Sequence, residues 1–173
     1  MRYRTLLLLL LLIVPSFVAA QVAKSQYIGY SYEGVKPSTQ LPNGVKHLGG
    51  GLLGDIEAET VYGVSEVQLG KTKMLWLEES TGKDATGITG WKVLDVLSFS
   101  MLARSRYVFF HGDPAIGCRR RREKYHIQNL VGEGRVVRAR SSFIPSNLWV
   151  ANLETKKFEP LSVTGVRCEY SEP

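Results

Sequence analysis

Short apolar runs separated by polar and glycine-containing stretches make up the chain from residue 55 to its C-terminus. Valine, isoleucine, tyrosine, phenylalanine and tryptophan dominate these runs, and such side chains suit a pleated, half-buried strand. No window of a dozen residues shows a sustained helical apolar stripe, and only residues 98–104 could form a turn or two of helix. The runs that predict strands are 60–69, 73–77, 91–99, 106–110, 125–131, 136–143, 148–152, 158–163 and 166–170.

This rhythm predicts one all-β domain over residues 55–173. We expect about eight short strands in a single antiparallel barrel or sandwich, beginning with a three-stranded meander. Neither an internal repeat nor a linker divides the stretch further. The pattern leaves the choice between barrel and sandwich open.

Residues 21–54 have a different composition, with seven glycines, two prolines, and Tyr27, Tyr30 and Tyr32 as the main apolar content. We expect an irregular Gly-rich segment that lies over the domain through its tyrosines. Residues 49–54 match the G-x-G-x-x-G spacing of dinucleotide sites. The preceding strand and following helix that such a site needs are missing from the pattern, so a glycine hinge is the better interpretation.

Residues 1–20 have the order of a secretory signal peptide. Arg2 and Arg4 precede an apolar run over residues 6–14, and small residues follow up to Ala20. The run is shorter than the roughly 20 apolar residues that cross a membrane, so we expect cleavage after Ala20 and no remaining transmembrane segment. The mature protein is therefore predicted to be secreted or periplasmic.

Cys118 and Cys168 are the two cysteines of the chain. In an exported protein such a pair predicts a disulfide bond, and no neighbouring residue suggests an activated thiol. Closing a loop of this length would stabilise the fold by roughly 4 kcal/mol.

Positive charge is concentrated between residues 104 and 140, which contain ten basic and three acidic residues. The rest of the mature chain is slightly acidic. A local basic surface attracts a polyanion or an acidic membrane face. Since export removes the chain from the nucleus, we expect an anionic envelope component or acidic polymer as partner, and no nucleic acid.

The densest charge is a run that we call the basic arm. It comprises Arg119, Arg120, Arg121, Arg122 and Lys124. Guanidinium groups are suited to phosphate, sulfate and carboxylate. The basic arm could equally be a solvated segment whose charges deter edge-to-edge aggregation.

Two further arginines could extend an anion-binding site around the basic arm. Strand alternation would place Arg138 and Arg140 on one face, and a hairpin through residues 132–134 would lay that strand beside the basic arm. The hypothesised anion-binding residues are Arg119, Arg120, Arg121, Arg122, Lys124, Arg138 and Arg140.

Other candidate chemistry is weaker. His111, Asp113 and His126 could contribute to a metal site or to acid–base catalysis, but their spacing matches no metal-ligand motif. The G-x-S-x-G nucleophile motif is missing from the sequence. We therefore predict no cofactor, no metal and no enzymatic activity.

Trp76, Trp91 and Trp149 lie within apolar runs. Their neighbours are core-type residues, which favours packing roles over exposed sugar-stacking platforms.

One set of residues carries a resemblance to a known group of proteins. It comprises residues 91–97, 148–152, Thr155, 158–160, Gly165 and Cys168. In these stretches the chain resembles small exported proteins of photosynthetic bacteria that have no assigned function. The resemblance covers about half of the mature chain, implies export and a compact body, and supports pairing of the last cysteine with an earlier one. It implies no site residues.

Together these patterns predict a non-enzymatic binding or envelope-associated protein that uses the basic arm against an anionic partner. One alternative is a small β-barrel that holds an apolar molecule in its interior. A third possibility is an envelope hydrolase, for which the sequence supplies no catalytic group.

Overall fold

The computed structural model describes residues 26–34, 41–42, 44–55, 57–83, 87–100, 107–109, 116–120 and 128–170. In this part of the chain lie eleven β-strands and a short 3₁₀-helix, η1 (Arg138–Arg140). The prediction of an all-β fold is therefore confirmed. The predicted signal peptide, residues 1–20, lies outside the described residues.

The first five strands form the N-terminal sheet, in which every neighbouring pair is antiparallel and the order is β1-β5-β4-β3-β2. Its strands are β1 (Ser31–Glu33), β2 (Val45–Leu53), β3 (Tyr62–Leu69), β4 (Thr72–Lys83) and β5 (Thr89–Ser100).

The remaining strands form the C-terminal sheet, with the order β6-β8-β9-β11-β7 and with β10 paired to β9. All of its pairings are antiparallel. Its strands are β6 (Tyr107–Phe109), β7 (Ile116–Arg120), β8 (Leu130–Val137), β9 (Ser142–Asn152), β10 (Lys157–Leu161) and β11 (Val166–Tyr170).

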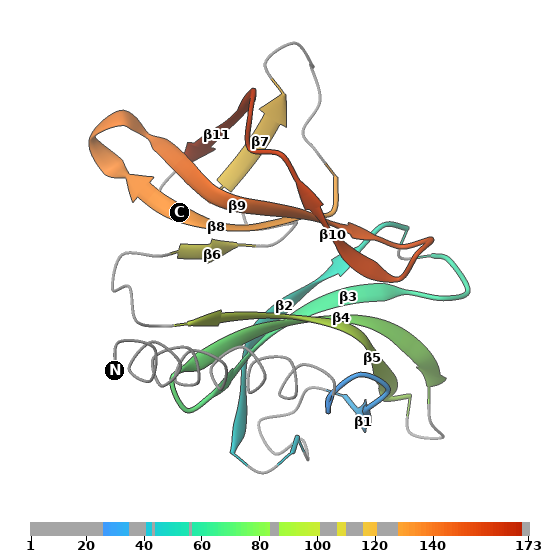
Figure 1. The fold of residues 1–173 in the computed structure, drawn as a ribbon. Coiled ribbons are helices and arrows are strands. Elements are labelled where there is room, and N and C mark those ends of the chain that lie inside the picture. Colours follow the sequence, from blue (N-terminus) through green and yellow to red (C-terminus); the bar gives the residue numbers. More distant parts are fainter. Residues whose placement is uncertain are drawn as a thin grey trace, which may run out of the picture.

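The two sheets lie one above the other as separate layers (Figure 1). The cluster between them includes Leu75, Leu77 and Phe99 from the N-terminal sheet and Val131 and Phe158 from the C-terminal sheet. The sheets are not closed into one barrel. This arrangement favours the sandwich over the barrel, the two architectures that the sequence left open.

The opposite, outer face of the N-terminal sheet is also buried. Along β4, Met74 and Trp76 point to this face while Leu75 and Leu77 point to the other sheet, and all four are at most 1% exposed. Tyr27 and Tyr32 cover the outer face, and the rings of Tyr27 and Trp76 lie 5.2 Å apart. The expectation that the N-terminal tyrosines lie over the domain is thus confirmed.

The prediction that residues 21–54 are irregular is wrong for two stretches. Residues 31–33 form β1, and residues 45–53 form the nine-residue edge strand β2. Glycine has a low intrinsic preference for strands, but every β2 residue except Leu48 pairs with β3, and this ladder outweighs the local preference.

Residues 132–134 do not form the predicted hairpin but lie within β8. Gly134 lies at a register shift in the β8–β9 pair, and a Cβ atom there would approach the ring of Phe143 to 2.5 Å, so this position needs glycine. The predicted strand 136–143 is likewise interrupted, because η1 separates β8 from β9.

A buried carboxylate joins the two sheets. Asp95, on β5, accepts a hydrogen bond from the backbone N–H of Phe158, on β10, at 2.9 Å. Its other oxygen accepts the N–H of Val96, also at 2.9 Å. Asp95 is only 7% exposed, so both bonds lie in a poorly solvated region, where charged hydrogen bonds are strong.

We expect Asp95→Ala to lower the free energy of unfolding by about 2–4 kcal/mol, because the N–H of Phe158 would lose its buried acceptor. Chemical denaturation measures this loss. Asp55→Ala is the matched control, since Asp55 accepts a bond only within an exposed turn. The bridging role would be refuted if both variants lost the same small amount.

Candidate functional site

A cavity of about 260 Å³ opens on the outer face of the N-terminal sheet. We call it the outer-face pocket. Its wall is mainly apolar, with a few polar groups from β2, β3 and β4. The lining residues are His47, Gly50, Gly51, Leu52, Gly63, Val64, Ser65, Glu78 and Trp91.

Glycines create the space for this pocket. A Cβ atom on Gly50 would lie 2.7 Å from the carbonyl oxygen of Val64, which forbids any larger residue there. A Cβ atom on Gly63 would lie 3.4 Å from the ring of Trp91. The two glycines therefore leave a part of the sheet surface without side chains, and Trp91 and the half-exposed Leu52 border it.

Glu78 is the buried polar group of the pocket. It is 2% exposed, and its two carboxyl oxygens accept different hydroxyl groups. The Tyr32 hydroxyl donates to Oε1 and the Ser65 hydroxyl donates to Oε2, both at 2.7 Å. β1, β3 and β4 thus meet at one carboxylate.

Burial raises the pKa of Glu78 to about 7, although the hydrogen bonds from Tyr32 and Ser65 act in the opposite direction. Burial and the charge of Glu78 also raise the pKa of Tyr32, so its hydroxyl stays protonated and remains a donor. The carboxyl group therefore changes its charge close to neutral pH while its tyrosine partner does not.

His47 contributes the other titratable side chain of the pocket. Its Nε2 atom is buried and has no hydrogen-bond partner among the described residues. Burial lowers the pKa of His47, with Glu66 opposing the shift. The Ser65 hydroxyl donates to Glu78, an arrangement suited to fixing a buried carboxylate rather than to a serine–histidine nucleophile.

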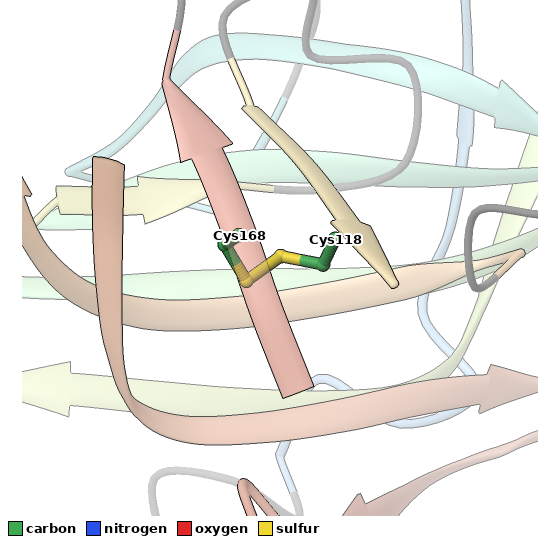
Figure 2. The surroundings of a disulfide bond; sticks show 2 residues. All are labelled: Cys118 and Cys168. Atoms are coloured by element: carbon green, nitrogen blue, oxygen red, sulfur yellow. A yellow bond between two sulfur atoms is a disulfide. The ribbon is translucent and has the colours of Figure 1, made fainter. Parts of the chain in front are cut away.

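The predicted disulfide is present between Cys118 on β7 and Cys168 on β11 (Figure 2). The two residues are direct partners across the antiparallel pair. Their side chains belong to a buried cluster that also contains Phe143 and Leu148. The bond therefore anchors the start of the basic arm to the C-terminal strand.

Two residues of the basic arm are described. Arg119 lies opposite Arg167 across the β7–β11 pair, and Arg120 lies opposite Val166. The guanidinium of Arg119 contacts the carboxylate of Glu169 at 2.9 Å in an exposed ion pair. An ion pair that is exposed to solvent contributes little interaction free energy.

The other five predicted anion-binding residues fall into two groups. Arg121, Arg122 and Lys124 lie outside the described residues. Arg138 and Arg140 belong to η1, so strand alternation does not apply to them. Moreover, β8 pairs with β6 and β9 rather than with β7, because residues 132–134 continue the strand.

The remaining sequence candidates have different outcomes. His111, Asp113 and His126 lie outside the described residues. Within the described part of the chain, no group of three potential metal ligands comes together, and no helix is both long and apolar enough to cross a bilayer. Trp76 is buried in the core as predicted, whereas Trp91 borders the outer-face pocket.

Sequence reasoning missed the outer-face pocket because it assigned residues 49–54 to a hinge. A usable signal was present on β4, where strand alternation puts Glu78 on the same face as Met74 and Trp76. A carboxylate that lies on the same strand face as two buried apolar residues indicates that the carboxylate is buried too.

Comparisons with protein-family models, with curated proteins and with solved structures found no match to this chain. The resemblance to exported proteins of photosynthetic bacteria stays a prediction. The function must therefore be argued from the geometry of this molecule.

The raised pKa of Glu78 predicts a specific pH dependence of stability. Between pH 4.5, the ordinary pKa of a glutamate side chain, and about pH 7, the folded protein holds a proton on Glu78 that the unfolded chain has released. This proton binding stabilises the fold fully at low pH, and the stabilisation is lost as the pH rises to about 7. Glu78→Gln removes this titration. Relative to the variant, the free energy of unfolding of the wild type should fall by up to about 3 kcal/mol between pH 4.5 and pH 8.

Thermal or urea unfolding over this pH range measures the difference. Glu79→Gln is the control, because Glu79 is adjacent in sequence but forms ion pairs with Lys156 and Lys92. The lowered pKa of His47 acts in the opposite direction in every variant and cancels from the comparison. A Glu78→Gln profile parallel to the wild type would contradict the assignment.

Proposed function

We propose that this chain is an exported, non-enzymatic binding protein whose ligand site is the outer-face pocket. The observation that carries the proposal is the hollow formed over Gly50 and Gly63, which Trp91 and Leu52 border and which contains the buried carboxyl of Glu78. An apolar surface with few, well-placed polar groups is typical of small-molecule sites.

The size of the pocket limits the ligand. At about 260 Å³ it lies near the lower end of ligand cavities, which favours a fragment-sized molecule of about ten non-hydrogen atoms. The tryptophan border favours a flat, apolar part in that molecule.

The ligand would bind from outside the sandwich rather than within a barrel. The space between the two sheets contains a cluster of buried side chains, including Leu53, Val64 and Ala151. The pocket lies on the opposite face of the N-terminal sheet, beside Tyr32. This position differs from the barrel interior that the sequence suggested as an alternative ligand site.

Export is a part of the same proposal. The signal-peptide pattern of residues 1–20 supports it, and the Cys118–Cys168 disulfide is consistent with an oxidising compartment such as the periplasm or the exterior.

We expect 2-phenylethanol, a neutral ring compound of suitable size, to bind with a Kd of about 1 mM or tighter. Amide resonances of β2, β3 and β5 should shift and saturate in an NMR titration. Trp91→Ala should raise the Kd about tenfold by removing the aromatic border. Ile144→Ala, an exposed position on the C-terminal sheet, is the control and should bind normally. Unchanged affinity in Trp91→Ala would refute the site.

The basic arm is a second candidate site, for a different partner. Arg119 and Arg167 are direct neighbours across the β7–β11 pair, and like charges in this position destabilise a sheet. Arg119 already contacts Glu169 in an exposed ion pair, so an anion bound between the two arginines would add to this weak compensation, and the nearby disulfide would keep the two strands in register. The partner would be an acidic polymer or another anionic component of the envelope.

Replacing Arg119, Arg120, Arg121 and Arg122 with serine should release the protein from an anionic column at clearly lower salt. The control replaces Lys46, Lys71, Lys83 and Lys157 with serine, which removes the same charge from exposed positions elsewhere. If both quadruple variants elute at the same salt concentration, net charge explains retention and the basic arm is not a site.

A further inference from the structure

We propose that the outer-face pocket takes a compact organic cation, an amine on a flat ring, whose charged group meets Glu78 while the ring packs on Trp91. This inference rests on the proposed function of the pocket and adds the chemical class of its ligand.

The carboxylate of Glu78 has unused acceptor capacity. Each oxygen accepts one hydroxyl, from Tyr32 or from Ser65. A carboxylate offers about four lone-pair positions, so one further position on each oxygen remains for a donor. Since Glu78 also lines the pocket, a ligand N–H group can reach a charge that solvent barely touches.

Trp91 is a suitable partner for the same cation. Tryptophan attracts cations over its ring face more strongly than the other aromatic residues do, and the attraction increases where water is excluded. Glu78 and Trp91 line one small cavity, so a single amine-bearing ring can contact both.

The surrounding charges do not oppose a cation. The titratable groups nearest Glu78 are Tyr32, which stays neutral, and His47, whose lowered pKa keeps it neutral near pH 7. Tyr30 adds a ring to the same cluster. Glu66 pairs with Lys73, and Lys92 faces Glu79 instead of lining the pocket.

An anionic ligand would fit poorly at the same place. Its charge would meet the carboxylate of Glu78, and among the described residues no lysine or arginine lines the cavity. A neutral ring would fill the volume but leave the buried charge without a counter-ion, so its affinity should be lower.

The test compares three compounds with nearly the same shape, namely phenethylamine, 2-phenylethanol and phenylacetate. At pH 8, where Glu78 is ionised, calorimetric titration should show phenethylamine binding at least about tenfold more tightly than 2-phenylethanol. Phenylacetate should bind most weakly. At pH 5.5 the carboxyl is protonated, and the preference for the amine should largely disappear.

Two variants locate the effect. Glu78→Gln should abolish the preference for phenethylamine at pH 8 while 2-phenylethanol still binds. Glu79→Gln removes the same charge at the next residue, outside the pocket lining, and should retain the preference.

The outcomes separate the two proposals. If phenethylamine and 2-phenylethanol bind equally well at pH 8, or phenylacetate binds best, the cation assignment is wrong and the pocket remains a ligand site. If none of the three compounds binds the wild-type protein, the proposed function itself is overturned.

Discussion

The fold depends on a strand that is apolar on both faces. Met74, Leu75, Trp76 and Leu77 are consecutive on β4 and all are buried, so neither face of the N-terminal sheet can remain in water. The C-terminal sheet covers one face. Tyr27 and Tyr32 cover the other, which ties the segment before β2 to the domain. The outer-face pocket lies beside this tyrosine cover, where glycines on β2 and β3 leave the sheet bare.

Much of the fold could be predicted from the sequence, because most apolar runs coincide with strands and most turn residues lie in the connections between strands. Residues 60–69 and 91–99 correspond closely to β3 and β5, and the chain turns between β3 and β4 in the gap between the predicted runs 60–69 and 73–77. Two of the errors involve glycine. In β2 and at Gly134, glycine sits inside a strand because another backbone or ring comes close, and this requirement depends on contacts distant in sequence. For the same reason the pocket could not be located from local patterns, whereas the disulfide could be predicted from cysteine count and export.

The two buried carboxylates of the N-terminal sheet differ in the partners that hold them. Asp95 accepts backbone N–H groups, which can only donate and therefore need a fixed acceptor. Glu78 accepts hydroxyl groups, and a hydroxyl can donate or accept. Glu78 can thus gain or lose a proton without losing its partners. The first arrangement suits a structural bridge between sheets, and the second suits a site whose charge responds to a ligand.

The disulfide, which the predicted compartment would allow to form, supports the outer-face pocket indirectly, through the packing of the two sheets. The loop between Cys118 and Cys168 contains β8, β9 and β10, so closing it restricts most of the C-terminal sheet in the unfolded chain. That sheet covers the inner face of β4, and β10 supplies the N–H group that Asp95 binds. The outer face of β4 can present Glu78 in a defined position only while the inner face stays covered. The disulfide therefore stabilises the outer-face pocket from the opposite side of the molecule, without any direct contact between the cysteines and the pocket lining.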